Sequence, residues 1–167
     1  ISSMIYEEST SHLKEIYTQA NKVYSRAMSD KWNNISDWLP YLEKSASDHE
    51  RYSYIYGRKQ EWGFKDFYFI SRNGEYITAD GIKGDTGLGS SLTLLIEERR
   101  RVVSSSALAE YPELTLFAVP SFIGSYRGFE FEAIGISINN RRISESLEIS
   151  AFEGRSESYV VDLDGRV

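Results

Sequence analysis

The sequence contains no cysteine among its 167 residues, so disulfides, thiolate metal sites and cysteine nucleophiles are excluded. No run of 18 apolar residues occurs, and we therefore expect no membrane-spanning segment within this sequence. No signal-peptide pattern is visible either. The first residues lead straight into a helical pattern and the last ones follow a hairpin turn, so we expect both ends to continue into longer segments.

An excess of positive charge is also missing. The formal net charge is −6, and residues 1–60 carry eight basic and eight acidic side chains, which leaves the negative excess in the C-terminal portion. Nucleic acid needs a basic surface, so we expect no nucleic-acid partner. Hydrophobic residues make up 41% of the chain and aromatic residues 14%, which is enough for a packed core.

No constellation typical of an enzyme can be assembled from the sequence. His12 and His49 stand without carboxylates or further histidines at metal-ligand spacing. Gly84–Ser91 has the glycines of a phosphate loop, but Ser90 occupies the place of its lysine. That segment predicts a loop entering a helix or, as an alternative, an anion site at the helix N-terminus. Asp162–Gly165 lacks the later ligands of a calcium loop and predicts a hairpin turn. We therefore expect no catalytic residue, no bound metal and no cofactor.

Two hairpins are predicted from Asn-Gly and Asp-Gly turns. The first lies in Phe67–Thr78 with its turn at Asn73-Gly74, and the second lies in Tyr159–Val167 with its turn at Asp164-Gly165. Both dipeptides favour a tight turn with two residues at positive φ.

The N-terminal part reads as a helix from Tyr6 to about Lys44. An apolar stripe at helical spacing runs along it, made of Leu13, Ile16, Ala20, Val23 and Ala27. The stripe predicts packing against the domain's own sheet or, alternatively, the seam of a parallel homodimer. Pro40 predicts a break near Trp38, because proline lacks an amide hydrogen and clashes with the preceding turn. Residues 45–63 are polar and tyrosine-rich, and predict a connector with a short helix.

The remaining pattern predicts an antiparallel α+β fold. An amphipathic helix around Leu92–Arg99 is expected after a cap at Ser90 or Ser91. Three strands follow, with a longer loop between the last two, and a short helix ends the fold: strands 102–108, 114–119 and 129–138, loop 120–128, helix 141–149. In the last strand the alternation of apolar residues changes phase near Ala133, which predicts a bulge or burial of both faces. Together with the first hairpin, this gives a five-stranded antiparallel sheet with flanking helices.

This order, with the segments Tyr68–Ile77, Leu114–Pro120 and Ser158–Arg166, resembles the double Cache domains. These are PAS-like extracytoplasmic sensor domains of bacterial membrane receptors. The resemblance implies a helical segment over 1–60, a membrane-distal module over 61–150, and the start of a membrane-proximal module over 151–167. It implies a periplasmic or extracellular location, with membrane segments outside this sequence. It also implies a cytoplasmic output domain of the diguanylate cyclase, histidine kinase or chemoreceptor type.

The amino-acid-sensing pattern of that family is incomplete here. Arg58 and Trp62 echo its first part, but Gly63 follows the tryptophan and the later Tyr-x-Asp is absent, which puts an amino-acid ligand in doubt.

Aromatic residues crowd the connector and the first hairpin, where their apolar bodies and polar tips suit a small-molecule pocket. We predict a pocket between the sheet and the segment from Arg58 to Trp62, with polar groups from Tyr68, Tyr76 and Asp80. The predicted function is ligand sensing for a transmembrane receptor. The alternatives are a ligand-free structural dimerisation module and a cytosolic PAS-like regulatory domain.

Overall fold

The structure is a computed structural model that describes residues 32–147, and side chains as far as Ile143. A helix covers residues 32–44, and the further elements follow in this order: α2 (Asp48–Trp62), β1 (Asp66–Ile70), β2 (Glu75–Thr78), β3 (Lys83–Asp85), α3 (Ser91–Ile96), β4 (Val102–Ser104), β5 (Leu114–Tyr126), β6 (Phe129–Asn139) and α4 (Asn140–Leu147). Within the described residues, no helix combines the length and the apolar character needed to cross a bilayer.

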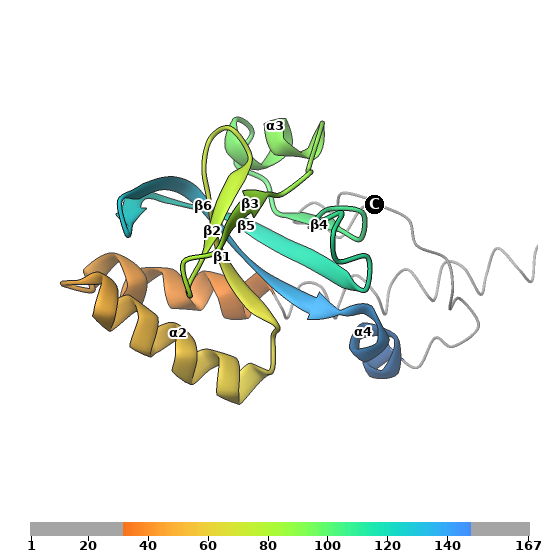
Figure 1. Ribbon diagram of the computed structural model, residues 1–167, viewed down its shortest axis with the longest axis horizontal. Coiled ribbons are helices and arrows are strands. Elements are labelled where there is room, and N and C mark those ends of the chain that lie inside the picture. Colours follow the sequence, from red (N-terminus) through yellow and green to blue (C-terminus); the bar gives the residue numbers. More distant parts are fainter. Residues whose placement is uncertain (1–31, 148–167) are drawn as a thin grey trace, which may run out of the picture.

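The strands form one antiparallel sheet in the order β3-β2-β1-β6-β5-β4 (Figure 1). This confirms the predicted α+β class and its PAS-like arrangement of helices around an antiparallel sheet. The sheet has six strands where five were predicted, because β3 forms in a segment interpreted as a glycine-rich loop. The end of β3 is fixed by Thr86, whose amide and hydroxyl both donate to the carbonyl of Gly74, at 2.9 and 2.6 Å.

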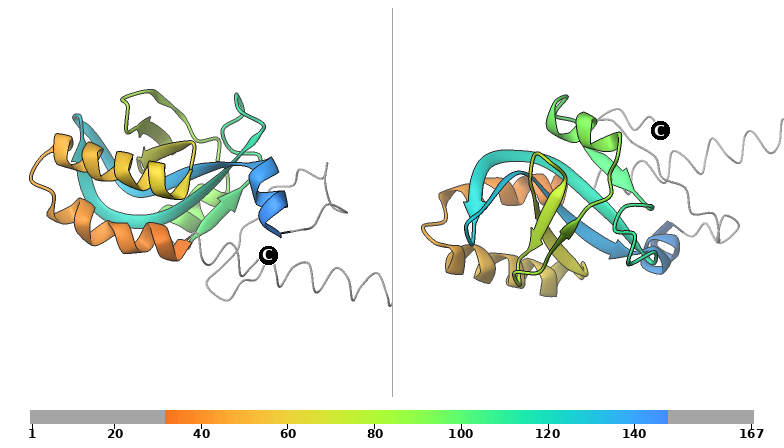
Figure 2. Two further views of the ribbon diagram at one scale, coloured as in Figure 1. Left: turned by 90° about the horizontal axis from the view of Figure 1, so that it is seen from below. Right: turned by 45° about the horizontal axis from the view of Figure 1, so that its top comes forward.

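Each face of the sheet carries its own hydrophobic core. The helix 32–44 and α2 run side by side over one face, and α3 with its neighbouring loops lies over the other (Figures 1 and 2). The helical face buries the larger aromatic side chains, which include Trp32, Trp38, Phe67, Phe69, Phe117, Tyr126 and Phe131. The opposite face buries a smaller set that includes Tyr68, Ile70, Tyr76, Leu95, Leu108 and Leu116.

The helix 32–44 continues through Pro40, so the predicted break near Trp38 was wrong. Four of its side chains, spaced three or four residues apart, are almost completely buried in the core: Trp32, Ile35, Trp38 and Leu42. Three of them precede the proline, the last by two residues, and Leu42 follows it by two residues. Their packing outweighs the roughly 3 kcal/mol that an interior proline costs a helix.

α2 replaces the predicted connector with a helix of 15 residues. Ser47 caps its N-terminus by accepting a hydrogen bond from the amide of Glu50, and the Glu50 carboxylate accepts one from the amide of Ala46. Gly63 ends the helix in the left-handed conformation, with φ of 70°. Caps at both ends therefore define a helix that its weak apolar periodicity does not reveal.

The first hairpin forms as predicted, but its turn differs from the expected one. Gly74 has a φ of 85°, whereas Asn73 is not among the described residues with positive φ. The Gly74 amide donates to the carbonyl of Ser71, and the Ser71 amide donates to the carbonyl of Glu75. This is a three-residue connection that ends in one left-handed glycine, the next most common hairpin type.

The segment predicted as a loop over 120–128 is mostly strand, because β5 continues to Tyr126. The register between β5 and β6 shifts between Pro120, opposite Ala133, and Gly124, opposite Phe131. The extra residues form a bulge on β5, opposite the predicted position and not in the last strand itself. Residues 133–138 of β6 are all buried, which agrees with the other explanation, burial of both faces.

The shorter elements differ from the prediction at their ends. α3 stops at Ile96, and Arg99 lies beyond it with a φ of 56°. β4 has three residues, and Leu108 lies in the following connection. α4 confirms the predicted last helix and begins one residue earlier. The apolar stripe from Leu13 to Ala27 with its dimer seam, His12, the second hairpin and the predicted module over 151–167 lie outside the described residues.

Candidate functional site

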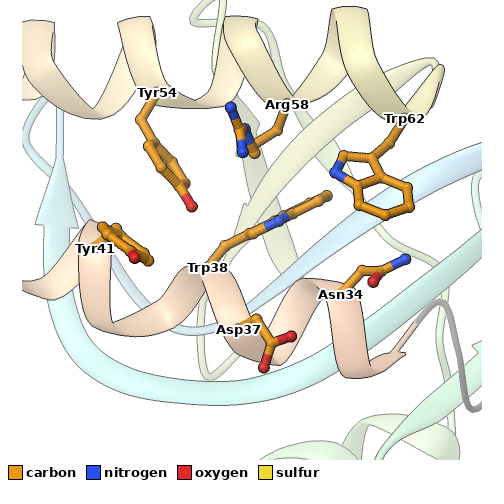
Figure 3. Close-up of a pocket in the computed structure, with 7 residues that line it drawn as sticks. All are labelled: Asn34, Asp37, Trp38, Tyr41, Tyr54, Arg58 and Trp62. Atoms are coloured by element: carbon orange, nitrogen blue, oxygen red, sulfur yellow. The ribbon is translucent and has the colours of Figure 1, made fainter.

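A groove with a volume of about 360 Å³ lies between the helix 32–44 and α2. We call it the interhelical groove, and Figure 3 shows the seven residues that line it: Asn34, Asp37, Trp38, Tyr41, Tyr54, Arg58 and Trp62.

Helical spacing places these side chains along one line on each helix. Tyr54, Arg58 and Trp62 are four residues apart on α2. On the other helix the contributing positions form two pairs at helical spacing, Asn34 with Trp38 and Asp37 with Tyr41. Residues at this spacing lie one above another on the same face of a helix. The two rows face each other because residues 45–47 make a short turn between the helices, as Figure 2 shows.

Aromatic rings form most of the groove. The ring of Trp38 lies between the two helices (Figure 3) and contacts Phe64 of the core, with centroids 5.7 Å apart. Tyr41 and Tyr54 stack across the groove with centroids 5.2 Å apart. Tyr41 is 61% exposed and Trp62 is 38% exposed, although both are large aromatic residues. The groove is therefore a partly apolar surface that is open to solvent.

Arg58 supplies the positive charge of the groove. Its guanidinium lies over the ring of Tyr54, 5.1 Å from the centroid, and its Nη1 pairs with Glu61 at 3.1 Å. Its Nε is buried and has no hydrogen-bond partner among the described residues. Burial raises the pKa of Tyr54, and the nearby Arg58 cation opposes this rise. A buried N–H without a partner is energetically costly, so the Nε–H of Arg58 is an unsatisfied donor among the described residues.

Asp80 lies in a different hollow, of about 100 Å³, between α2 and the sheet. Tyr52, Lys59 and Asp66 line the same hollow. A hydrogen bond to Asp80 raises the pKa of the Tyr52 hydroxyl. A pocket between α2 and the sheet therefore exists, but neither Arg58 nor Trp62 lines it.

Tyr68 and Tyr76 lie on the opposite face of the sheet. Their rings meet edge to face, with centroids 4.9 Å apart. The Tyr68 hydroxyl donates to Ser137 Oγ at 2.9 Å, and burial strongly raises the pKa of Tyr68. Tyr76 lines a third hollow, of about 280 Å³, next to β3. The five predicted residues are thus divided among three places, and the sheet separates the two tyrosines from the groove.

Sequence reasoning missed Trp38, Tyr41 and Tyr54 as groove residues. The signal was present as aromatic residues at helical spacing, but it became readable only once 45–63 was known to hold a full helix. Among the described residues, no group of three or more histidine, aspartate or glutamate side chains is placed to hold a metal ion.

No family model matches the chain, and no curated protein matches it. Two solved structures of the sensory domain of the Campylobacter jejuni chemoreceptor CcmL are similar to it. The structure with isoleucine bound has a TM-score of 0.42 and 10% sequence identity, and the match covers 88% of this chain and 66% of that one. For a second structure of that domain the TM-score is 0.43, the identity 11%, and the coverage 86% and 66%. The chain thus spans just under two thirds of the length of these sensory domains.

Proposed function

We propose that this chain is the ligand-sensing part of a transmembrane receptor, with an extracytoplasmic location, and that a small molecule binds in the interhelical groove. The observation that supports this best is the combination of four aromatic side chains with a guanidinium whose Nε is buried and has no partner in the described part of the chain. Small-molecule sites are typically apolar and aromatic hollows with a few placed polar groups.

A ligand between the two helices would change how they pack. The helix 32–44 follows the N-terminal segment in the sequence. A displacement of this helix relative to α2 would therefore be transmitted towards the N-terminal end of the chain. A coupling free energy of about 1–3 kcal/mol between ligand and signalling state is typical of allosteric proteins. In this proposal, segment 1–60 is the transmitting helical part, 61–150 the membrane-distal module, and 151–167 the start of a membrane-proximal module. The output would be of the diguanylate cyclase, histidine kinase or chemoreceptor type.

A thermal-shift screen of amino acids, organic acids and amines tests the proposal. A hit should stabilise the protein and should lose its effect in Trp62→Ala. It should keep its effect in Asp80→Ala and in Tyr76→Phe, since these residues lie in the other two hollows. A hit that persists in Trp62→Ala and disappears in Asp80→Ala would move the site to the hollow between α2 and the sheet.

A structural dimerisation module remains the second candidate. The exposure of Tyr41 and Trp62 on the outer side of the helix pair favours it, because large apolar patches often mark protein interfaces. Sedimentation velocity separates the two functions. A dimer that dissociates in the double variant Tyr41→Ser/Trp62→Ser, together with no hit in the screen, would favour the structural role.

A further inference from the structure

We infer that the interhelical groove binds a monocarboxylate with a flat apolar body, of the arylacetate type. This inference rests on the proposed function and adds the chemical class of the ligand. Three features of the groove carry it: the free edge of the Arg58 guanidinium, the placement of the nearby acidic groups, and the aromatic walls.

The free edge of the guanidinium suits a carboxylate. Nη1 of Arg58 is engaged by Glu61, while Nε is buried and unpaired among the described residues. A guanidinium presents its N–H groups as a planar fork that matches the two oxygens of a carboxylate. A carboxylate that displaced the side chains covering Nε would give this N–H its missing acceptor, and the pairing with Glu61 would remain.

The acidic groups limit the ligand to one negative charge. Asp37 lines the groove, and Figure 3 shows its carboxylate pointing away from Arg58. Glu61 neutralises part of the Arg58 charge from the solvent side, where its side chain is 56% exposed. A second carboxylate on the ligand would therefore meet repulsion from Asp37 or Glu61, with one cation to offset it among the seven lining residues.

The walls select a flat apolar body. Trp38 lies in the middle of the groove, with Tyr54 and Trp62 to either side of it (Figure 3). Aromatic side chains attract other rings in offset or edge-to-face contacts. The volume of about 360 Å³ lies at the lower end of the range for small-molecule pockets, which fits a single ring with a short acid side chain.

Isothermal titration calorimetry with three matched probes tests the inference. Phenylacetate carries the carboxylate, 2-phenylacetamide is its neutral counterpart, and 2-phenylethylamine carries a positive charge instead. Phenylacetate should bind at least about tenfold more tightly than either of the other two, the difference expected when a charge-assisted hydrogen bond is lost.

Two substitutions, one in the groove and one beside it, should move the affinity in opposite directions. Arg58→Gln should weaken phenylacetate binding by about 10- to 100-fold. Glu61→Gln should tighten it about two- to fivefold, because it removes a competing negative charge from an exposed position. A purely structural role of Arg58 would not produce this gain. Arg72→Gln is the matched control, since Arg72 is an exposed arginine that pairs with Glu132, away from the groove.

The outcomes separate the ligand class from the sensing function. Equal binding of the three probes, no phenylacetate binding, or unchanged affinity in Arg58→Gln would overturn the carboxylate assignment. A Trp62-dependent hit of another chemical class in the thermal-shift screen would then leave the sensing function standing. Absence of any hit in that screen would count against both.

Discussion

Arg51 of α2 donates a hydrogen bond from Nη1 to the carbonyl oxygen of Ser125, at 2.7 Å, and so fastens the tip of the β5–β6 hairpin to the helical layer. Its Nε donates to the carbonyl of Leu42, at 2.9 Å, near the end of the helix 32–44. The guanidinium also lies over the rings of Phe122 and Phe131, at 5.7 and 5.9 Å from their centroids. One side chain thus joins both helices of the groove to the sheet.

Replacing Arg51 should destabilise the fold. Arg51→Ala removes two charge-assisted hydrogen bonds and two cation–π contacts, and we expect a loss of about 1–3 kcal/mol in the free energy of unfolding. Arg51→Lys should recover part of this loss, because an ammonium group keeps the charge but not the planar fork. Urea denaturation measures the effect, with Arg72→Ala as a control that should change stability by less than about 0.5 kcal/mol. Equal stability of the two alanine variants would contradict this role.

The hydroxyl group of Tyr126 should contribute to the stability of the fold. This tyrosine is fully buried, its ring stacks on Phe69 with centroids 4.3 Å apart, and its hydroxyl donates to the carbonyl of Ala79. Tyr126→Phe keeps the stacking and leaves that carbonyl without a partner, so we expect a loss of about 1–2 kcal/mol. Thermal unfolding monitored by circular dichroism measures it. An unchanged melting temperature would mean that this hydrogen bond adds nothing to stability.

Pro40→Ala should stabilise the protein. Pro40 is exposed within the continuous helix 32–44, and alanine would supply the missing amide hydrogen without disturbing the buried face. The gain should be about 2–2.5 kcal/mol, since the helix benefit of roughly 3 kcal/mol is reduced by about 0.4–1 kcal/mol through the greater entropy of the unfolded chain. Denaturant midpoints of the two proteins give the value. A loss of stability would show that the proline is needed to shape the helix.

The stability contribution of Asp66 should depend on pH. Burial raises its pKa above the ordinary value of 3.8, and Lys59 and Lys65 oppose this rise. A raised carboxyl pKa means that the folded protein holds the proton more tightly than the unfolded chain. Stability is therefore lost as pH rises from 3.8 through the higher folded pKa, and the loss is complete above it.

Asp66→Asn should accordingly be slightly more stable than the wild type at pH 7. The expected gain is roughly a few tenths of a kcal/mol, because Asp66 is only partly buried and solvent screens its charge. The gain should vanish below pH 3.8, where the aspartate is protonated in both states. Chemical denaturation of both proteins at pH 3 and pH 7 checks this. A stability advantage of Asp66→Asn that grows as the pH falls would contradict the prediction.

The sheet could be predicted because its signals are local. Gly74 marked the first hairpin, and the alternation of apolar residues marked β6 and the change of phase near Ala133. The failures came from elements that depend on distant contacts. Trp38 and Leu42 keep the helix intact around Pro40 through burial against the sheet, and β3 is fixed by the two hydrogen bonds from Thr86 to Gly74.

The candidate site was less predictable than the fold. Arg58 and Trp62 were predicted to line a pocket against the sheet. They share the interhelical groove instead, and their partners come from the preceding helix and not from the hairpin. Residue type alone could not show on which face of the sheet Tyr68 and Tyr76 point, because β1 and β2 are buried on both faces and lack clear alternation. Whether any of the five residues binds a ligand remains a prediction.

α2 is anchored at both of its ends. Asp48 accepts a hydrogen bond from the amide of Arg127 at 3.0 Å, and the carbonyl of Gly63 accepts one from Arg142. A helix held in this way cannot tilt without breaking a contact at one end. A ligand that enters between the two helices would therefore have to break the contact at Asp48 or the one at Gly63 before α2 could tilt.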